Sequence, residues 1–345
     1  MSINNRRSFV KKLSALPLLA TPTLISFSKS NENAIIKPPK LEKGQTIGII
    51  TPASAVPDEE KLRAAGKTLE EKGYKVKFGE HAFGRWGYLS GTDEERAGDL
   101  NKMFADNEVD AIMCSRGGWG GARLLELIDY NAIKKNPKVL VGYSDVTSLL
   151  NAIFAKTGLI AFHGPMGLSD WNPFTSKNFD KVIVKEKHYS LKGGKKDEED
   201  LVTGRFVINE GKASGTLVGG NLTVLCGMVG SSYLPDFEGS ILLLEDVGEA
   251  VYRIDRYLVH LKLAGILDKV AGIVFSSCND CDQGPSDKGF SLKQVLEQHI
   301  KPLGVPAFYG TMVGHLNEQY TLPVGAKVEV NAKRSKIKLL EAAVS

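Results

Sequence analysis

A serine, a carboxylate and a histidine stand at the ends of apolar segments that lie far apart in the chain. Ser144 follows a run of strand type ending at Gly142 and opens an amphipathic segment. Glu245 ends a second apolar run, and His315 lies after a glycine between apolar segments. A serine hydroxyl is a weak nucleophile unless an imidazole takes its proton, and that imidazole needs a carboxylate to set its tautomer and stabilise its charge. These residue types therefore indicate nucleophilic catalysis by serine.

Each of these three residues has an alternative interpretation or a rival. Ser144 stands where Ser and Asp commonly cap a helix, and the surrounding spacing is not that of the G-x-S-x-G turn. His163 ends a strand just beyond the helix that Ser144 opens, so it rivals His315 or lines the site. Asp246 and Glu249 rival Glu245 as the carboxylate. Because successive strand residues point to opposite faces, only one of Glu245 and Asp246 can reach the site.

Apolar runs of strand length alternate with amphipathic segments along the body of the chain. The alternation in the first half is typical of a parallel sheet with helices on both faces. Expected strands there are 45–52, 75–78, 110–114, 139–142 and 159–162, and expected helices are 58–72, 92–105, 121–129 and 146–154. In the second half we expect strands near 213–218, 240–244, 272–275 and 327–330, and helices at 222–229 and 254–264.

The fold class predicted by this pattern is α/β with two domains. The first domain, residues 40–167, carries Ser144 on an open parallel sheet with helices on both faces. The pattern lapses over 168–205, which we interpret as a segment crossing between domains. Residues 206–345 then form a smaller, mixed α/β domain that carries the carboxylate and the histidine. The active site would lie in the interdomain cleft, where strand ends meet.

Seven short motifs resemble, in order, those of the LD-carboxypeptidases. This serine peptidase family includes murein tetrapeptide carboxypeptidases and microcin C self-immunity peptidases. The resemblance extends from about residue 40 to about residue 330. The motifs are Ile50-Thr-Pro-Ala-Ser54, Tyr88-Leu-Ser-Gly-Thr-Asp-Glu-Glu-Arg96, Ser115-Arg-Gly-Gly-Trp-Gly-Gly-Ala-Arg123, Gly142-Tyr-Ser-Asp145, Gly219-Gly-Asn-Leu222, Leu244-Glu-Asp246 with Tyr252-Arg-Ile-Asp-Arg256, and Gly314-His315.

The resemblance implies a role for each candidate. It makes Ser144 the nucleophile, His315 the general base and Glu245 the carboxylate that orients His315. It also implies an oxyanion hole formed by the backbone N–H of Asp145 and of a glycine in the loop after residue 115, for which we choose Gly118. No metal ligands and no cofactor are expected for this mechanism.

The glycine loop 115–121 is also a candidate binding element. It matches neither G-x-G-x-x-G nor the P-loop, so it is a plain turn or a cradle for the oxyanion that a serine nucleophile requires. It contains Trp119 where the family usually has Tyr, which changes the pocket wall. Arg116 could hold the substrate's terminal carboxylate, since Arg binds carboxylates in bidentate geometry, and Arg253 and Arg256 compete for this role.

The family implies hydrolysis of the bond between an L-centre and a C-terminal D-amino acid. The expected partner is a muropeptide, with release of D-Ala from murein tetrapeptides during peptidoglycan recycling or remodelling. One alternative is an immunity-type peptidase that cleaves a peptide–nucleotide antibiotic. Another is a non-catalytic periplasmic muropeptide-binding protein, since two α/β lobes around a cleft also describe such proteins. Homodimers are common in the family, so the resemblance is compatible with a homodimer.

Charge is concentrated at the N-terminus. The formal net charge is +4, but residues 1–30 hold five basic residues and no acid, so the remainder has 39 basic residues (44 less 5) against 40 acidic ones. Such a balance does not favour nucleic-acid binding. Arg6-Arg7 with the weakly apolar stretch 13–27 resembles a twin-arginine export signal, and the stretch is too short and proline-interrupted for a stable membrane span. We expect a periplasmic protein, with an uncleaved membrane anchor or a cytoplasmic protein with a disordered basic tail as alternatives.

Four cysteines are present, two of them in the C-x-x-C pair Cys278 and Cys281. A zinc site would need a second pair of ligands, whereas Cys114 and Cys226 lie alone in apolar segments. The pair lies in a polar loop and not at the start of a helix, which disfavours a thioredoxin-type motif. We therefore expect a loop disulfide or two free thiols.

Overall fold

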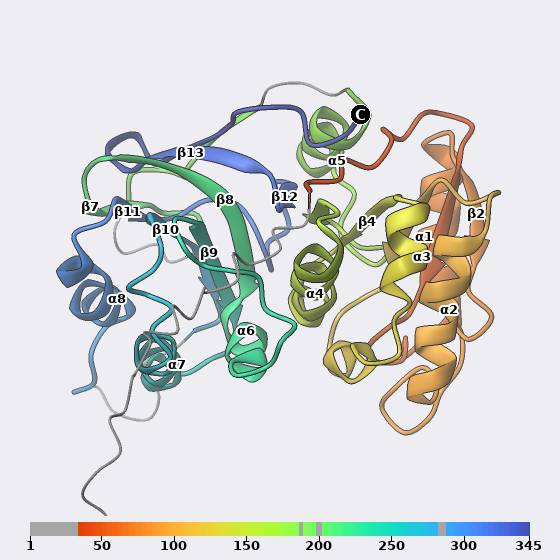
Figure 1. The fold of residues 1–345 in the computed structure, drawn as a ribbon, viewed down its shortest axis with the longest axis horizontal. Helices are drawn as coiled ribbons and strands as arrows, with labels where there is room; N and C mark the ends of the chain where they lie inside the picture. The colour runs from red at the N-terminus through yellow and green to blue at the C-terminus, as the bar shows by residue number, and fades with distance from the viewer. Residues whose placement is uncertain (1–33, 186–188, 198–201, 282–287) are drawn as a thin grey trace, which may run out of the picture. The chain divides into compact units, whose positions relative to one another are not determined.

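The computed structural model describes residues 34–185, 189–197, 202–281 and 288–345, which belong to one compact unit (Figure 1). The expected export segment, 1–30, lies outside the described residues. No helix within the described part of the chain is long and apolar enough to cross a membrane.

The N-terminal sheet has the order β12-β5-β4-β3-β1-β2. Strands β1 to β5 are parallel in the doubly wound order 2-1-3-4-5, and β12 pairs with β5 in antiparallel orientation. In this architecture ligands bind beyond the carboxyl ends of the strands. The strands are β1 (Thr46–Ile50), β2 (Lys75–Phe78), β3 (Ala111–Cys114), β4 (Val139–Gly142), β5 (Ala161–His163) and β12 (Leu322–Val324).

Helices cover both faces of this sheet, as predicted. Alternate strand residues enter different cores: Ile49 belongs to the same hydrophobic core as Leu62 of α1, whereas Ile50 belongs to the core that contains Leu100 of α2 and Leu150 of α4. Because successive side chains of a strand point to opposite faces, β1 contributes residues to the cores on both sides of the sheet. The helices of this part are α1 (Glu59–Glu71), α2 (Asp93–Ala105), α3 (Tyr130–Lys135), α4 (Thr147–Thr157) and α5 (Pro173–Phe179).

The C-terminal sheet has the order β6-β14-β13-β8-β9-β10-β11-β7. Its central strands β8 to β11 are parallel and the flanking strands are antiparallel, which confirms a mixed sheet. With eight described strands against six it is the larger of the two sheets. The strands are β6 (Ser190–Lys192), β7 (Phe206–Asn209), β8 (Lys212–Asn221), β9 (Ile241–Val247), β10 (Gly272–Asn279), β11 (Ala307–Tyr309), β13 (Lys327–Asn331) and β14 (Lys336–Leu339).

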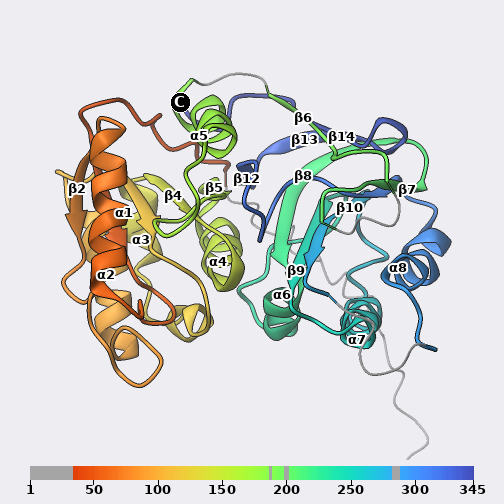
Figure 2. The ribbon, with the colours of Figure 1, turned by 180° about the vertical axis from the view of Figure 1, so that it is seen from behind.

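Three helices line one side of β8, β9 and β10 (Figure 1). They are α6 (Leu222–Met228), α7 (Val251–Leu263) and α8 (Leu292–Ile300). Figure 2 shows the same arrangement from behind, with α4 beside β5 and facing the C-terminal sheet.

One expectation about local structure was wrong. A 3₁₀ turn, Gly121–Leu124, and the separate helix α3 replace a helix over 121–129, because Asp129 caps α3 by accepting from the N–H groups of Asn131 and Ala132. The expected crossing segment 168–205 contains α5 and β6. Strand β12 joins the N-terminal sheet although it lies late in the chain. The exact domain boundaries stay a prediction.

Candidate active site

Ser144 lies at a sharp turn between β4 and α4. Its φ is +64°, a left-handed conformation that is costly for a residue with a side chain. The turn is tight because a Cβ on Gly142 would lie 2.6 Å from Cγ1 of Val146. Neither the 3₁₀ turn Ser144–Val146 nor α4 has a side-chain cap, so the alternative interpretation of Ser144 as a cap is wrong. The turn instead presents the hydroxyl at the carboxyl edge of the sheet, as a nucleophile elbow does.

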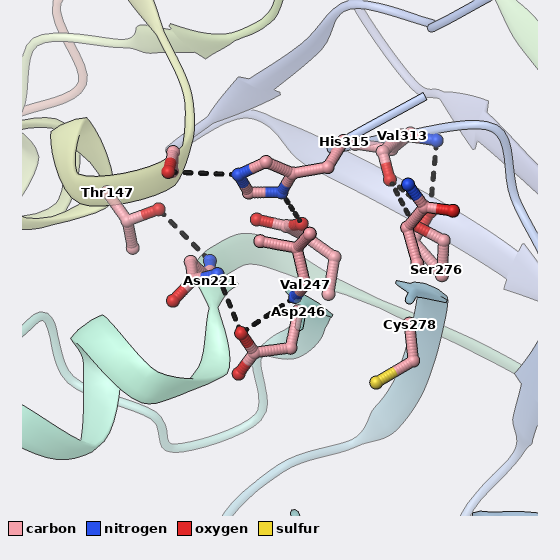
Figure 3. A network of polar contacts seen from close by, with 12 residues as sticks. Thr147, Asn221, Asp246, Val247, Ser276, Cys278, Val313 and His315 are labelled. Atoms are coloured by element: carbon pink, nitrogen blue, oxygen red, sulfur yellow. Dashed lines mark hydrogen bonds and ion pairs between the residues drawn. The ribbon is translucent and has the colours of Figure 1, made fainter. Parts of the chain in front are cut away.

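His315 connects Ser144 to Glu245. Its Nε2 lies 2.9 Å from Oγ of Ser144, and its Nδ1 lies 2.8 Å from Oε2 of Glu245. Figure 3 shows these contacts on the two ring nitrogens of His315. The preceding Gly314 has φ +108°, and a Cβ there would lie 2.5 Å from Oε2 of Glu245. Only glycine therefore lets the loop between β11 and β12 approach the carboxylate this closely.

The strand β9 separates the rival carboxylates. Glu245 is fully buried and faces His315, whereas Asp246 points the other way and accepts hydrogen bonds from Nδ2 of Asn221 and from the backbone N–H and Oγ1 of Thr223 (Figure 3). Glu249 lies beyond the strand, where its Oε1 is 3.3 Å from Oγ1 of Thr223. The structure therefore brings Glu245, and neither of its rivals, to His315.

The buried pair shifts both pKa values toward the charged forms. Burial alone would raise the pKa of Glu245, but the charge and hydrogen bond of His315, together with the nearby His163, hold it well below its usual range. Burial likewise opposes the charge on His315, yet the Glu245 carboxylate outweighs it and raises the pKa of His315 above 6.5. Glu245 thus stays ionised and makes His315 a stronger base.

The glycine loop lies directly against Ser144. A Cβ on Gly117 would lie 2.9 Å from Oγ of Ser144 and 3.1 Å from the backbone N of Asp145. The next residue, Gly118, has φ +111° and faces Ser54, whose Oγ accepts from the N–H of Trp119 at 3.0 Å. Gly117 and the N–H of Asp145 are therefore neighbours beside Ser144, an arrangement that an oxyanion hole in this loop would require.

Asp145 also fixes the glycine loop with its side chain. The buried carboxylate accepts from the N–H of Gly121 at 2.6 Å. Burial raises the pKa of Asp145 to about 6, although the hydrogen bond from Gly121 and the charge of Arg96 oppose this shift. Buried Arg96 donates to the carbonyl of Gly120 at 2.9 Å. Both ends of the turn after Trp119 are thus held by buried charged groups.

The three expected substrate-binding residues lie in different environments. Arg116 is half-buried, and its guanidinium lies 3.3 Å from the carbonyl of Ala55. The side chain of Trp119 is 54% exposed. His163 is fully buried and its Nε2 lies 3.7 Å from Oε1 of Glu245. The expectation that His163 lines the substrate site is wrong, because its side chain, on β5 between β4 and β12, has no exposed surface.

A pocket with a volume of about 250 Å³ opens beside His315. Sequence reasoning missed its other walls, which come from the end of β10 and from loops without an apolar period. Its lining residues are Val202, Thr203, Asn279, Met312, His315, Leu316, Asn317 and Glu318.

Two further features bear on chemistry. Within the described ranges no group of three or more His, Cys, Asp or Glu side chains could hold a metal ion. Cys278 and Cys281 form a disulfide, one of the two expected states, and Cys114 and Cys226 are free and buried. Cys278 lies on β10 opposite Asp246 of β9.

Comparison with known proteins decides the family. Models of the LD-carboxypeptidase N-terminal and C-terminal domains match residues 47–164 and 214–330. The chain is 41% identical to the probable murein peptide carboxypeptidase of Bacillus subtilis over 90% of its length and 95% of the relative.

The chain belongs to the LD-carboxypeptidase family.

Two further relatives illustrate the range of this family. The murein tetrapeptide carboxypeptidase of Pseudomonas aeruginosa is 31% identical, with 84% of this chain and 94% of the relative covered. A solved structure of the microcin C7 self-immunity protein MccF superposes with a TM-score of 0.81 at 28% identity, covering 90% of this chain and 100% of the other. The resemblance and the two-domain α/β fold expected for an LD-carboxypeptidase are thereby confirmed.

Proposed function

We propose that this LD-carboxypeptidase hydrolyses the bond before the C-terminal D-amino acid of murein tetrapeptides, with Ser144, His315 and Glu245 as its catalytic triad. The observation that carries the proposal is the position of His315, which lies 2.9 Å from Oγ of Ser144 and 2.8 Å from Oε2 of Glu245. The names of the relatives in Bacillus subtilis and Pseudomonas aeruginosa support murein peptides as the substrate class.

The mechanism begins with attack by Ser144. Its Oγ bonds to the carbonyl carbon while His315 Nε2 takes the hydroxyl proton, and the negative charge of Glu245 stabilises the imidazolium. The N–H groups of Asp145 and of Gly118 hold the oxyanion. Collapse of the tetrahedral intermediate breaks the C–N bond, and His315 returns the proton to the leaving amine. Water then hydrolyses the acyl ester, with His315 again acting as the base.

We assign the terminal carboxylate of the substrate to Arg116, which lies on the glycine loop. A carboxypeptidase must recognise this charge, and the planar guanidinium does so in bidentate geometry. Arg253 is the weaker candidate, because its guanidinium lies 3.5 Å from Oε2 of Glu249.

Released D-alanine tests the proposed function. Purified protein is incubated with a diaminopimelate-containing tetrapeptide that ends in D-Ala and, separately, with the same peptide ending in L-Ala. We expect D-Ala release by wild type, little cleavage of the L-peptide, and loss of release in Ser144→Ala. Tight peptide binding without release would favour a binding protein instead. Cleavage of an aminoacyl sulfamoyl adenosine without tetrapeptide cleavage would favour the immunity-type activity that the similarity to MccF suggests.

We also propose that the protein acts in the periplasm, where murein peptides occur. Supporting this are the twin-arginine-like Arg6-Arg7 and the Cys278–Cys281 disulfide, which fits an oxidising compartment. Replacing both arginines by lysine keeps the charge, so we expect this variant to remain in the cytoplasm with reduced thiols while wild type is exported. Equal export of both would contradict this localisation. We further expect a homodimer, which light scattering of the purified protein would test.

A further inference from the structure

His163 and Glu245 present unpartnered polar atoms to each other in the interior. His163 is the last residue of β5 and is fully buried. Its Nε2 lies 3.7 Å from Oε1 of Glu245. Three buried atoms have no hydrogen-bond partner among the described residues. They are Nδ1 and Nε2 of His163 and Oε1 of Glu245. The other oxygen of the carboxylate, Oε2, is the one that His315 contacts.

A buried carboxylate with one unsatisfied oxygen is costly, since hydrogen bonds to charged groups are among the stronger ones in proteins. A neutral imidazole carries one N–H donor and can supply the missing bond. The gap of 3.7 Å is longer than a hydrogen bond by less than an ångström. Hydrogen bonds of catalytic groups are often long before substrate binds and shorten in the reacting complex.

The ring of His163 is held where it can make this contact. Its backbone pairs with Gly142 of β4 and Leu322 of β12, so the residue is held on both sides by neighbouring strands of the N-terminal sheet. On the other side, Gly220 of β8 has φ +140°, and a Cβ there would lie 3.2 Å from Cδ2 of His163. Glycine at this position leaves room for the imidazole beside the carboxylate.

We propose that His163 is a positioning residue of the catalytic carboxylate. Its Nε2–H donates to Oε1 of Glu245, so that Oε2 stays bonded to Nδ1 of His315 when the imidazole becomes charged. Ser144 and His163 come from the same sheet, whereas Glu245 and His315 come from the C-terminal half. The contact therefore ties the carboxylate to the sheet that carries the nucleophile. This inference rests on the proposed triad.

Three substitutions separate the donor from the bulk of the side chain. His163→Phe keeps a ring of similar size without a donor. His163→Gln places an amide N–H near the position of Nε2, and His163→Asn places one near that of Nδ1. His299→Phe is the matched control, because it removes another histidine–carboxylate contact, 2.6 Å from Asp255 on α7.

Steady-state release of D-Ala by these variants gives the test. We expect His163→Phe and His163→Asn to lower kcat about 10- to 100-fold, the value of a hydrogen bond to a charged group, with KM changed less than about 3-fold. His163→Gln should recover most of kcat, and His299→Phe should match wild type. The proposal is overturned if Gln and Asn lose kcat equally, or if no substitution changes kcat. Should the Phe variant not fold, the comparison of Gln with Asn still decides.

A second measurement tests the contact between His163 and Glu245 even if the proposed substrate is wrong. If wild type releases no D-amino acid, the proposed function fails, and the contact is tested by urea unfolding of His163→Phe, Glu245→Gln and the double variant. We expect the midpoint of the double variant to differ clearly from the sum of the single changes, because the two side chains interact. Additive midpoints would overturn the positioning role.

Discussion

Asn151 and Gly219 exchange two hydrogen bonds between α4, the helix that follows Ser144, and the C-terminal sheet. Nδ2 of Asn151 donates to the carbonyl of Gly219 at 2.9 Å, and the N–H of Gly219 donates to Oδ1 of Asn151 at 3.0 Å. One turn earlier on α4, Oγ1 of Thr147 accepts from the N–H of Asn221 at 3.0 Å (Figure 3). Because Asn221 pairs with Glu245 in the sheet, these bonds set the distance between Ser144 and the carboxylate.

Replacing Asn151 by leucine, which has a similar shape, should weaken the contact between α4 and β8. The substitution leaves the N–H and the carbonyl of Gly219 buried without partners, so we expect a loss of about 2–5 kcal/mol in the free energy of unfolding and a lower kcat. Urea denaturation and D-Ala release measure the two effects. Asn101→Leu is the control: its amide also donates to a carbonyl, that of Leu127, and accepts from an N–H, that of Asp129, but in an exposed position. An equal loss in both variants would contradict the special role of Asn151.

Gly117 should not tolerate a side chain. In Gly117→Ala the new Cβ would lie 2.7 Å from Cβ and 2.9 Å from Oγ of Ser144, so Ser144 or the loop must move. A displacement of about 1 Å can cost on the order of 100-fold in rate, and we expect kcat to fall at least that far. Gly98→Ala in α2 is the control, since a Cβ there meets nothing within 4 Å. It should keep full activity and gain about 0.5–1 kcal/mol of stability.

Arg96 should stabilise the glycine loop through its buried hydrogen bonds. Its fully buried guanidinium donates to the carbonyls of Pro52, Gly91 and Gly120, and it pairs with Asp93. We expect Arg96→Met to lose about 3–5 kcal/mol of unfolding free energy and to lower kcat through the displaced loop.

Two further variants sharpen that test. Arg96→Lys should not rescue the loss, because an ammonium group cannot reproduce the guanidinium's fork of donors. Arg123→Met removes a partly exposed guanidinium from the same Asp93, 2.9 Å away, and should cost less than about 1 kcal/mol. Comparable thermal melting of Arg96→Met and Arg123→Met would refute this account of the loop.

The pH dependence of kcat/KM should report His315. The imidazole must be neutral to accept a proton, so activity falls as pH drops through its pKa, which Glu245 raises above 6.5. In Glu245→Gln the negative charge is lost, the pKa of His315 falls, and the acid limb should shift to lower pH. At the pH optimum kcat should fall about 10³- to 10⁴-fold, because the tautomer is no longer fixed. An unchanged acid limb in this variant would exclude His315 as the titrating group.

The sequence predicts the elements whose periodicity is strong and misses those defined by long-range pairing. The buried run 139–142 before Ser144 and the run 241–244 are unbroken by polar residues, and both lie in central strands. Strand β12 is three residues long and contains Pro323, so its pairing with β5 leaves no local signal. Helix α8, by contrast, does carry a local sequence signal, because Ser291 and Gln294 form a capping box at its N-terminus.

The residues of the candidate site divide in the same way, into those that local sequence predicts and those whose contacts depend on long-range pairing. Residue chemistry and the family motifs point to Ser144 and His315, but the environment of His163 depends on two neighbouring strands and cannot be read from its own segment. The Gly219-Gly-Asn221 motif was visible, yet its contacts with α4 require the docking of two sheets.

The central claim is that Ser144 and His315 act as one catalytic unit. The most direct test is kcat/KM for D-Ala release from the tetrapeptide by Ser144→Ala, His315→Ala and the double variant. Residues of one unit lose their effects non-additively, so we expect each single change to lower the rate by about 10⁴-fold or more and the double variant to be no slower. Losses that multiply in the double variant, or substantial release without Ser144, would contradict the account.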